Sequence, residues 1–295
     1  MSQLNAVQML LDNKADVDQA GPKGNTALFY ASKRGNTKIV QTLLRYGANI
    51  NHCNCSGMTA LMVACTKNKT NVIDCLLTKE AKINSVDPYG TTALIFAVIY
   101  KSTEAIQILL KWKAKVNIKT YYGATALRIA AKSGFLKGVG LLLQNYAKVN
   151  CTDEQGRSAL HFAVTKGHLK TAKILLNNGA NINQPRNDGL TPLMIATKKD
   201  NSRLVKLLLN MKADRDIVTP QGETALSIAK ANRFLKIFDL LEGKESKSRP
   251  VFDIPGTVVD HTNSSFDSED SDEDSQLPSS AQDNWPSYIS VKNDK

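Results

Sequence analysis

The chain has 295 residues, of which 42% are hydrophobic and only 6% aromatic, so its core must be mostly aliphatic. No apolar run reaches the roughly 20 residues that a membrane-spanning helix needs. Met1 to Leu11 lacks the features of a secretory signal. The five cysteines are an odd number without the spacing of a disulfide framework, which predicts reduced thiols in a cytoplasmic or nuclear protein.

The net charge of +11 is divided unevenly along the chain. Residues 248–295 hold 3 basic and 10 acidic residues, which makes their charge −7. The remaining residues hold the other 35 basic and 17 acidic residues, which makes their charge +18. A basic body and an acidic tail predict electrostatic contact, either with an acidic partner or between these two parts of the chain.

A glycine recurs at intervals of 33 residues without any insertion. An alanine stands seven residues after each of these glycines, and a Leu-Leu pair follows in six of the seven intervals. A fixed internal period of this length predicts a repeat architecture instead of ordinary globular domains. We call these positions the framework glycines: Gly24, Gly57, Gly90, Gly123, Gly156, Gly189 and Gly222.

Residues 1–23 match only the second half of this unit, through Val7, Leu10, Leu11, Ala15 and Val17. They are therefore predicted to form a partial N-terminal repeat without its first helix. Two explanations are open at this point: a shortened isoform or fragment, or a lone helix that serves as a minimal cap.

Each unit in residues 24–243 has the pattern of two short helices. A hydroxyl residue two positions after the framework glycine, such as Thr26, is a natural N-cap. Pro192 falls in the first helical turn, where its missing N–H is not needed. Residues such as Gly35 end the first helix because they tolerate a left-handed conformation. A second helix follows, with apolar residues at helical spacing in residues 39–44.

Two segments, GNTALFYASKRGNTKIVQTLLRYGANIN and GRSALHFAVTKGHLKTAKILLNNGANIN, closely resemble the ankyrin repeat. The resemblance extends from about Asn5 to Leu241. It implies an all-α solenoid of stacked helix-turn-helix units joined by hairpin loops. Residues 24–243 are then six full repeats plus a C-terminal capping repeat, and the polar residues Arg215 and Glu242 replace apolar ones in the last repeats. Lys101 and Arg233 depart from the family pattern in the left-handed glycine position, which predicts strain at those helix ends.

The sequence contains no phosphate-binding loop, nucleophile elbow or paired-carboxylate motif, so it predicts neither an enzyme nor a cofactor. His52, Cys53 and Cys55 share one loop and are zinc-ligand types, but no second ligand pair accompanies them. We therefore interpret them as loop residues. The resemblance implies that His161, in the second quoted segment, hydrogen-bonds between neighbouring loops.

The resemblance also implies that a partner binds at the loop tips and on the exposed side of the first helices. Aromatic and apolar residues stand at these positions in the middle repeats, and basic residues stand on either side of them. This pattern favours an acidic protein partner, with nucleic acid as a less favoured rival, bound by a monomeric chain. The candidate residues are Lys33, Arg34, Lys67, Tyr89, Ile99, Tyr100, Tyr121, Tyr122, Lys132, Arg157, Lys166, Lys198 and Lys199.

Residues 244–295 are rich in serine and acidic residues, which predicts an acidic disordered tail. Ser264, Ser268 and Ser271 lie among carboxylates and are candidate phosphorylation sites for an acid-directed kinase. The tail is expected to contact the basic body and compete with an acidic ligand. The whole sequence predicts a non-enzymatic adaptor or scaffold, and the alternative is a regulatory or inhibitory subunit of an enzyme.

Overall fold

The computed structural model describes residues 3–243, which form 15 helices and two isolated β-bridges. The predicted tail, its three serines and its expected contact with the body lie outside these residues.

The inner helices follow the framework glycines: α2 (Ala27–Arg34), α4 (Ala60–Thr66), α6 (Ala93–Ile99), α8 (Ala126–Lys132), α10 (Ala159–Thr165), α12 (Pro192–Lys198) and α14 (Ala225–Ala231). The other helices are α1 (Gln3–Asp12) and the outer helices α3 (Thr37–Arg45), α5 (Thr70–Thr78), α7 (Thr103–Lys111), α9 (Leu136–Gln144), α11 (Leu169–Asn177), α13 (Ser202–Asn210) and α15 (Leu235–Glu242).

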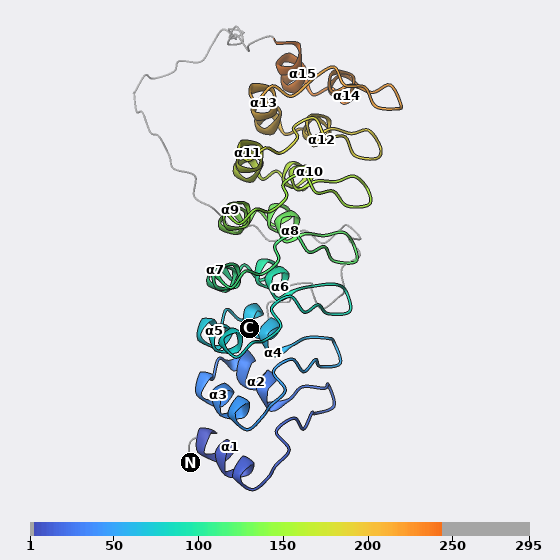
Figure 1. Ribbon diagram of the computed structural model, residues 1–295. Coiled ribbons are helices and arrows are strands. Elements are labelled where there is room, and N and C mark those ends of the chain that lie inside the picture. Colours follow the sequence, from blue (N-terminus) through green and yellow to red (C-terminus); the bar gives the residue numbers. More distant parts are fainter. Residues whose placement is uncertain (1–2, 244–295) are drawn as a thin grey trace, which may run out of the picture. The chain divides into compact units, whose positions relative to one another are not determined.

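The seven inner and outer pairs, called repeats 1 to 7, are stacked in chain order (Figure 1). Each inner helix packs against its own outer helix and against the inner helices of the neighbouring repeats. Hairpin loops project from the inner side of the stack, and α1 packs against α3 without an inner helix of its own (Figure 1). The predicted all-α stack of helix pairs is confirmed.

The ends of the inner helices follow the predicted capping pattern. The Thr26 hydroxyl accepts a hydrogen bond from the Phe29 N–H at 3.3 Å, and equivalent threonines cap five further inner helices. Gly35 ends α2 in the left-handed conformation, with φ 86°. Lys101 and Arg233 occupy the same conformation, with φ 53° and 58°. A side chain with a Cβ is unfavourable there, so these two helix ends carry backbone strain.

The core lies between the two helices of each repeat and between neighbouring repeats. The alanine seven residues after each framework glycine is buried in every repeat, which lets inner helices approach closely. The first leucine of each Leu-Leu pair is also buried, from Leu43 in repeat 1 to Leu208 in repeat 6. At the C-terminal end of the stack, the guanidinium of Arg215, which follows α13, donates to the Leu241 carbonyl of α15 at 2.7 Å and so satisfies a carbonyl of the last helical turn.

A row of side-chain amides connects each repeat to the next. The Asn51 side-chain oxygen accepts a hydrogen bond from the Lys82 N–H at 2.8 Å. The same bond recurs at intervals of one repeat, ending with Asn183 and the Asp214 N–H at 2.9 Å. These bonds tie each repeat to its neighbour, because each joins an asparagine side chain of one loop to a backbone N–H of the next.

Candidate partner-binding surface

Three of the predicted tyrosines stand on two adjacent hairpins in the middle of the stack. Tyr121 is 70% exposed, Tyr122 is 42% exposed and Tyr89 is half-buried. The Tyr121 N–H donates to the Tyr89 carbonyl at 3.0 Å, which ties the two hairpins together. Buried Asp87 accepts hydrogen bonds from the N–H groups of Tyr89 at 2.9 Å and Thr91 at 2.7 Å. The aromatic hairpins are therefore held in place before any partner binds.

Ile99 and Tyr100 lie at the opposite end of α6 from these hairpins. A seven-residue helix is about 10 Å long, so the five predicted apolar residues form two groups separated by roughly that length. Tyr100 is 41% exposed, and partial burial raises the pKa of its hydroxyl. Ile99 is half-buried. The structure brings together Tyr89, Tyr121 and Tyr122, but it does not add Tyr100 to that cluster.

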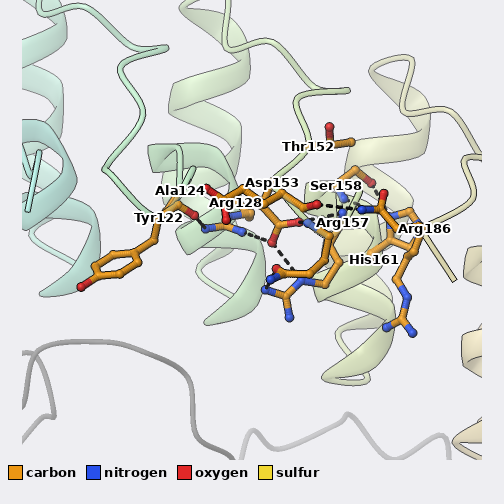
Figure 2. A network of polar contacts seen from close by, with 12 residues as sticks. Tyr122, Ala124, Arg128, Thr152, Asp153, Arg157, Ser158, His161 and Arg186 are labelled. Carbon is orange, nitrogen blue, oxygen red and sulfur yellow. Dashed lines mark hydrogen bonds and ion pairs between the residues drawn. The ribbon is translucent and has the colours of Figure 1, made fainter.

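A charged network lies beside the Tyr122 backbone, and the Tyr122 side chain points away from it (Figure 2). Arg128, in the first turn of α8, donates from Nη1 to the Asp153 carboxylate on the next hairpin. Its Nη2 donates to the Tyr122 carbonyl at 3.4 Å. The Arg128 guanidinium also lies over the Phe162 ring, 5.0 Å from the centroid. Arg128 thus links the tyrosine hairpin of repeat 4 to the hairpin and inner helix of repeat 5.

Arg157 belongs to the same network, and its guanidinium is already partnered. Its Nε donates to Asp153 at 2.8 Å, and Nη2 donates to the Gln155 side chain at 2.9 Å. The guanidinium lies 4.8 Å from the Phe162 centroid, so the ring faces two arginines. Burial raises the pKa of Asp153, but bonds from the Arg157 N–H and side chain and the charges of Arg128 and Arg157 outweigh it and lower the pKa.

His161 bonds to the start of its own helix through Nδ1, and its ring also interacts with the backbone of the next loop. Its Nδ1 accepts from the Ser158 N–H at 3.0 Å and lies 2.9 Å from the Ser158 hydroxyl. Within residues 3–243, no acceptor lies at both the distance and the angle of a hydrogen bond from His161 Nε2. Burial lowers the pKa of His161 to about 4, although the nearby backbone of Gln184 and of Leu190, in the next loop, partly opposes this.

The remaining predicted residues are lysines and one arginine at the C-terminal ends of the inner helices. Lys132 is half-buried and the others are exposed: Lys33, Arg34, Lys67, Lys166, Lys198 and Lys199. Lys198 makes an exposed ion pair with Glu223 at 3.0 Å. Such an exposed pair contributes little to stability. The exposure of these side chains favours contact with solvent or a ligand over a structural role.

Two of the residues considered as zinc ligands contact backbone carbonyls, one on the preceding hairpin and one in their own loop. His52 Nε2 lies 3.0 Å from the Gly24 carbonyl, and the Cys53 thiol lies 3.6 Å from the Asn51 carbonyl. In residues 3–243, no group of histidine, cysteine and carboxylate side chains has the arrangement of a metal site. No helix in the same residues is long and apolar enough to cross a bilayer.

Sequence reasoning missed Arg128 and Asp153. Arg128 stands five residues after a framework glycine, a position that is mostly buried and holds Met62, Ile95 and Met194 in other repeats. A charged residue in a buried position needs a partner. That anomaly was a usable signal for a buried ion pair, although it could not have identified Asp153.

Comparisons with known proteins agree with this architecture. A family model of ankyrin repeats in three copies matches residues 1–87, 38–120, 71–153, 119–186 and 160–249. The crystal structure of the ankyrin repeat domain of Bcl-3, described as a unique member of the IκB protein family, is similar with a TM-score of 0.69 and 27% identity. The match covers 75% of this chain and 100% of that chain. The human ASB11 ankyrin repeat domain is similar with a TM-score of 0.64 and 25% identity, over 75% of this chain and 98% of that one. No curated protein matches the chain in sequence.

Proposed function

Because this chain belongs to the ankyrin-repeat family, we propose that it is a non-enzymatic adaptor that binds a partner protein through its inner surface. By inner surface we mean the hairpin tips together with the exposed side of the inner helices. Ankyrin repeats are general protein-interaction modules. The stacked repeats offer an extended surface in which each repeat contributes a few variable side chains.

The observation that carries the proposal is the pair of exposed tyrosines, Tyr121 and Tyr122, on one hairpin whose backbone is held by hydrogen bonds to Tyr89 and Arg128. Tyrosine is enriched in the residues that dominate binding energy, because its ring buries a large area and its hydroxyl still bonds. The hairpins need little ordering on binding, since Asp87 and Arg128 already hold their backbones. The basic residues around them favour an acidic partner.

The proposal is tested by comparing partner capture by the wild-type chain with capture by a variant in which four tyrosines become alanine. These are Tyr89, Tyr100, Tyr121 and Tyr122. Captured proteins are quantified by mass spectrometry, and circular dichroism confirms that the variant is folded. A partner enriched by the wild type is expected to be lost by at least about tenfold, since each hot-spot side chain contributes about 1–2 kcal/mol or more.

The matched control replaces exposed aromatic residues on the outer side, Trp112 and Tyr146, by alanine. This variant is expected to retain the partner. Equal retention by the four-tyrosine variant would show that the aromatic hairpins do not form the binding surface. If the captured partner is an enzyme whose activity falls on binding, the chain is a regulatory subunit and not a passive adaptor.

A further inference from the structure

A continuous row of basic residues runs along the stack, independently of the tyrosine hairpins. It occupies the positions nine to eleven residues after each framework glycine, where the inner helices end (Figure 1). Every repeat contributes at least one basic residue, and Asp200 is the one acidic residue at these positions. The basic row consists of Lys33, Arg34, Lys67, Lys101, Lys132, Lys166, Lys198, Lys199 and Arg233.

Favourable interaction with the helix dipole does not account for this row. A basic residue near a helix C-terminus gains about 0.3–1 kcal/mol from the partial negative charge there. That reasoning applies equally to the outer helices, yet α9 ends in Gln144, Asn145 and Tyr146, and α11 ends in Asn177, Asn178 and Gly179. The basic residues are continuous on the inner side and interrupted on the outer side, which points to a ligand on the inner side.

Most of the row's charge is not neutralised within the repeats. Lys198 pairs with Glu223 at 3.0 Å. No carboxylate of residues 3–243 lies within ion-pair distance of Lys33, Lys67 or Lys166, all of which are exposed. Like charges arranged in a line repel one another, and a ligand with a matching line of negative charge removes that repulsion.

The spacing of the row identifies the kind of ligand. Packed helices lie about 8–10 Å apart, and an extended peptide advances about 3.3 Å per residue. We propose that the basic row binds an extended acidic segment of the partner protein, with one carboxylate for each repeat except repeat 3 and therefore an acidic residue at about every third position. Opposite repeat 3, where Ile99 and Tyr100 precede the single basic residue Lys101, the segment carries an apolar residue in place of the carboxylate.

A peptide fits this spacing better than a nucleic acid does. One strand of B-DNA carries a phosphate about every 3.4 Å, so one basic residue per repeat would meet only about one phosphate in three. The inference rests on the proposed function, in that the segment belongs to the protein partner. It adds that the segment is acidic and that its carboxylates recur at the spacing of the repeats.

The test uses synthetic peptides of about 21 residues, three for each inner helix. The spaced peptide has glutamate at every third position and serine or glycine between, with leucine replacing the third glutamate. The block peptide has the same composition with its glutamates contiguous, and a thymidine oligonucleotide of about the same length serves as the nucleic-acid probe. Binding is measured by fluorescence anisotropy at about 50 mM and about 200 mM salt.

The spaced peptide is expected to bind at least about tenfold tighter than the block peptide and to weaken at the higher salt concentration. Replacing Lys33, Lys67 and Lys166 by glutamine is expected to reduce its affinity at least about tenfold and to flatten the salt dependence. The charge-matched control replaces Lys111, Lys173 and Lys206, on the outer helices, by glutamine and is expected to change affinity less than about twofold.

Equal binding of the spaced and block peptides would overturn the proposed register, and equal weakening by both lysine variants would overturn the assignment to the inner row. Tighter binding of the oligonucleotide would assign the row to nucleic acid instead. These failures are distinguishable from failure of the proposed function, because the four-tyrosine variant tests partner capture without changing any basic residue.

Discussion

Acidification should destabilise the chain through His161, whose side chain is buried against its own helix start. The residue is 1% exposed, and its Nδ1 accepts the Ser158 N–H at 3.0 Å, so that nitrogen carries no proton. Burial holds the pKa at about 4 in the folded chain, against 6.5 for an ordinary histidine. Between these values the unfolded chain takes up a proton and the folded chain does not. The stabilisation is therefore complete above pH 6.5 and is lost as the pH falls to about 4, by on the order of 3 kcal/mol.

The perturbation that isolates this effect is His161→Met. Met62 and Met194 occupy the same position in repeats 2 and 6 and are equally buried, so methionine fits there. Urea unfolding, followed by far-UV circular dichroism at about pH 7 and about pH 4.5, measures the free energy of unfolding of both proteins. The variant is expected to lose about 2–3 kcal/mol less on acidification than the wild type.

His168 also contributes to the loss of stability on acidification, because burial lowers its pKa. It is present in both proteins, so its contribution cancels when their pH profiles are compared. If His161→Met loses as much stability between the two pH values as the wild type, the buried neutral histidine is not the source of the pH dependence and the reasoning fails.

Three further changes test local features of the fold by thermal or urea unfolding. Gly140→Ala, in the middle of α9 where an added Cβ meets nothing within 4 Å, should raise the free energy of unfolding by about 1 kcal/mol, whereas Gly138→Ala should not, because its Cβ would lie 2.4 Å from the Phe135 ring. A similar gain for both alanines would contradict the packing argument. Lys101→Gly should add about 0.5–1 kcal/mol by relieving the left-handed strain at φ 53°, and a loss would show that the strain is absent. Asp153→Ala should cost about 3 kcal/mol because it removes the carboxylate shared by two arginines, and a cost below about 1 kcal/mol would show that the network is not stabilising.

The local architecture could be predicted from the sequence because the same residue pattern recurs in all seven repeats. Hydroxyl N-caps such as Thr26, the buried alanine positions and the first leucine of each pair all have the predicted roles. Even the left-handed backbone of Lys101 followed from its alignment with glycines such as Gly35. These features depend on residues within a few positions of one another, where periodicity and propensity are direct signals.

Contacts between repeats were not readable, because they depend on how one repeat is rotated against the next. Arg128 stood out as a charge at a buried position, but several carboxylates were candidates, and only the stacked structure selects Asp153. The same holds for Arg157, which the sequence placed among the candidate binding residues and the structure pairs with Asp153.

For the proposed binding surface, the resemblance of the sequence to ankyrin repeats supplied the variable positions, and the sequence itself determined their chemistry. The tertiary structure decided how those side chains are grouped. It joined Tyr89, Tyr121 and Tyr122 on tied hairpins, placed Tyr100 about one helix length away, and aligned the basic residues into one row. The reason is geometric: a periodic sequence specifies what each repeat presents, and the stacking of rigid repeats specifies which side chains become neighbours.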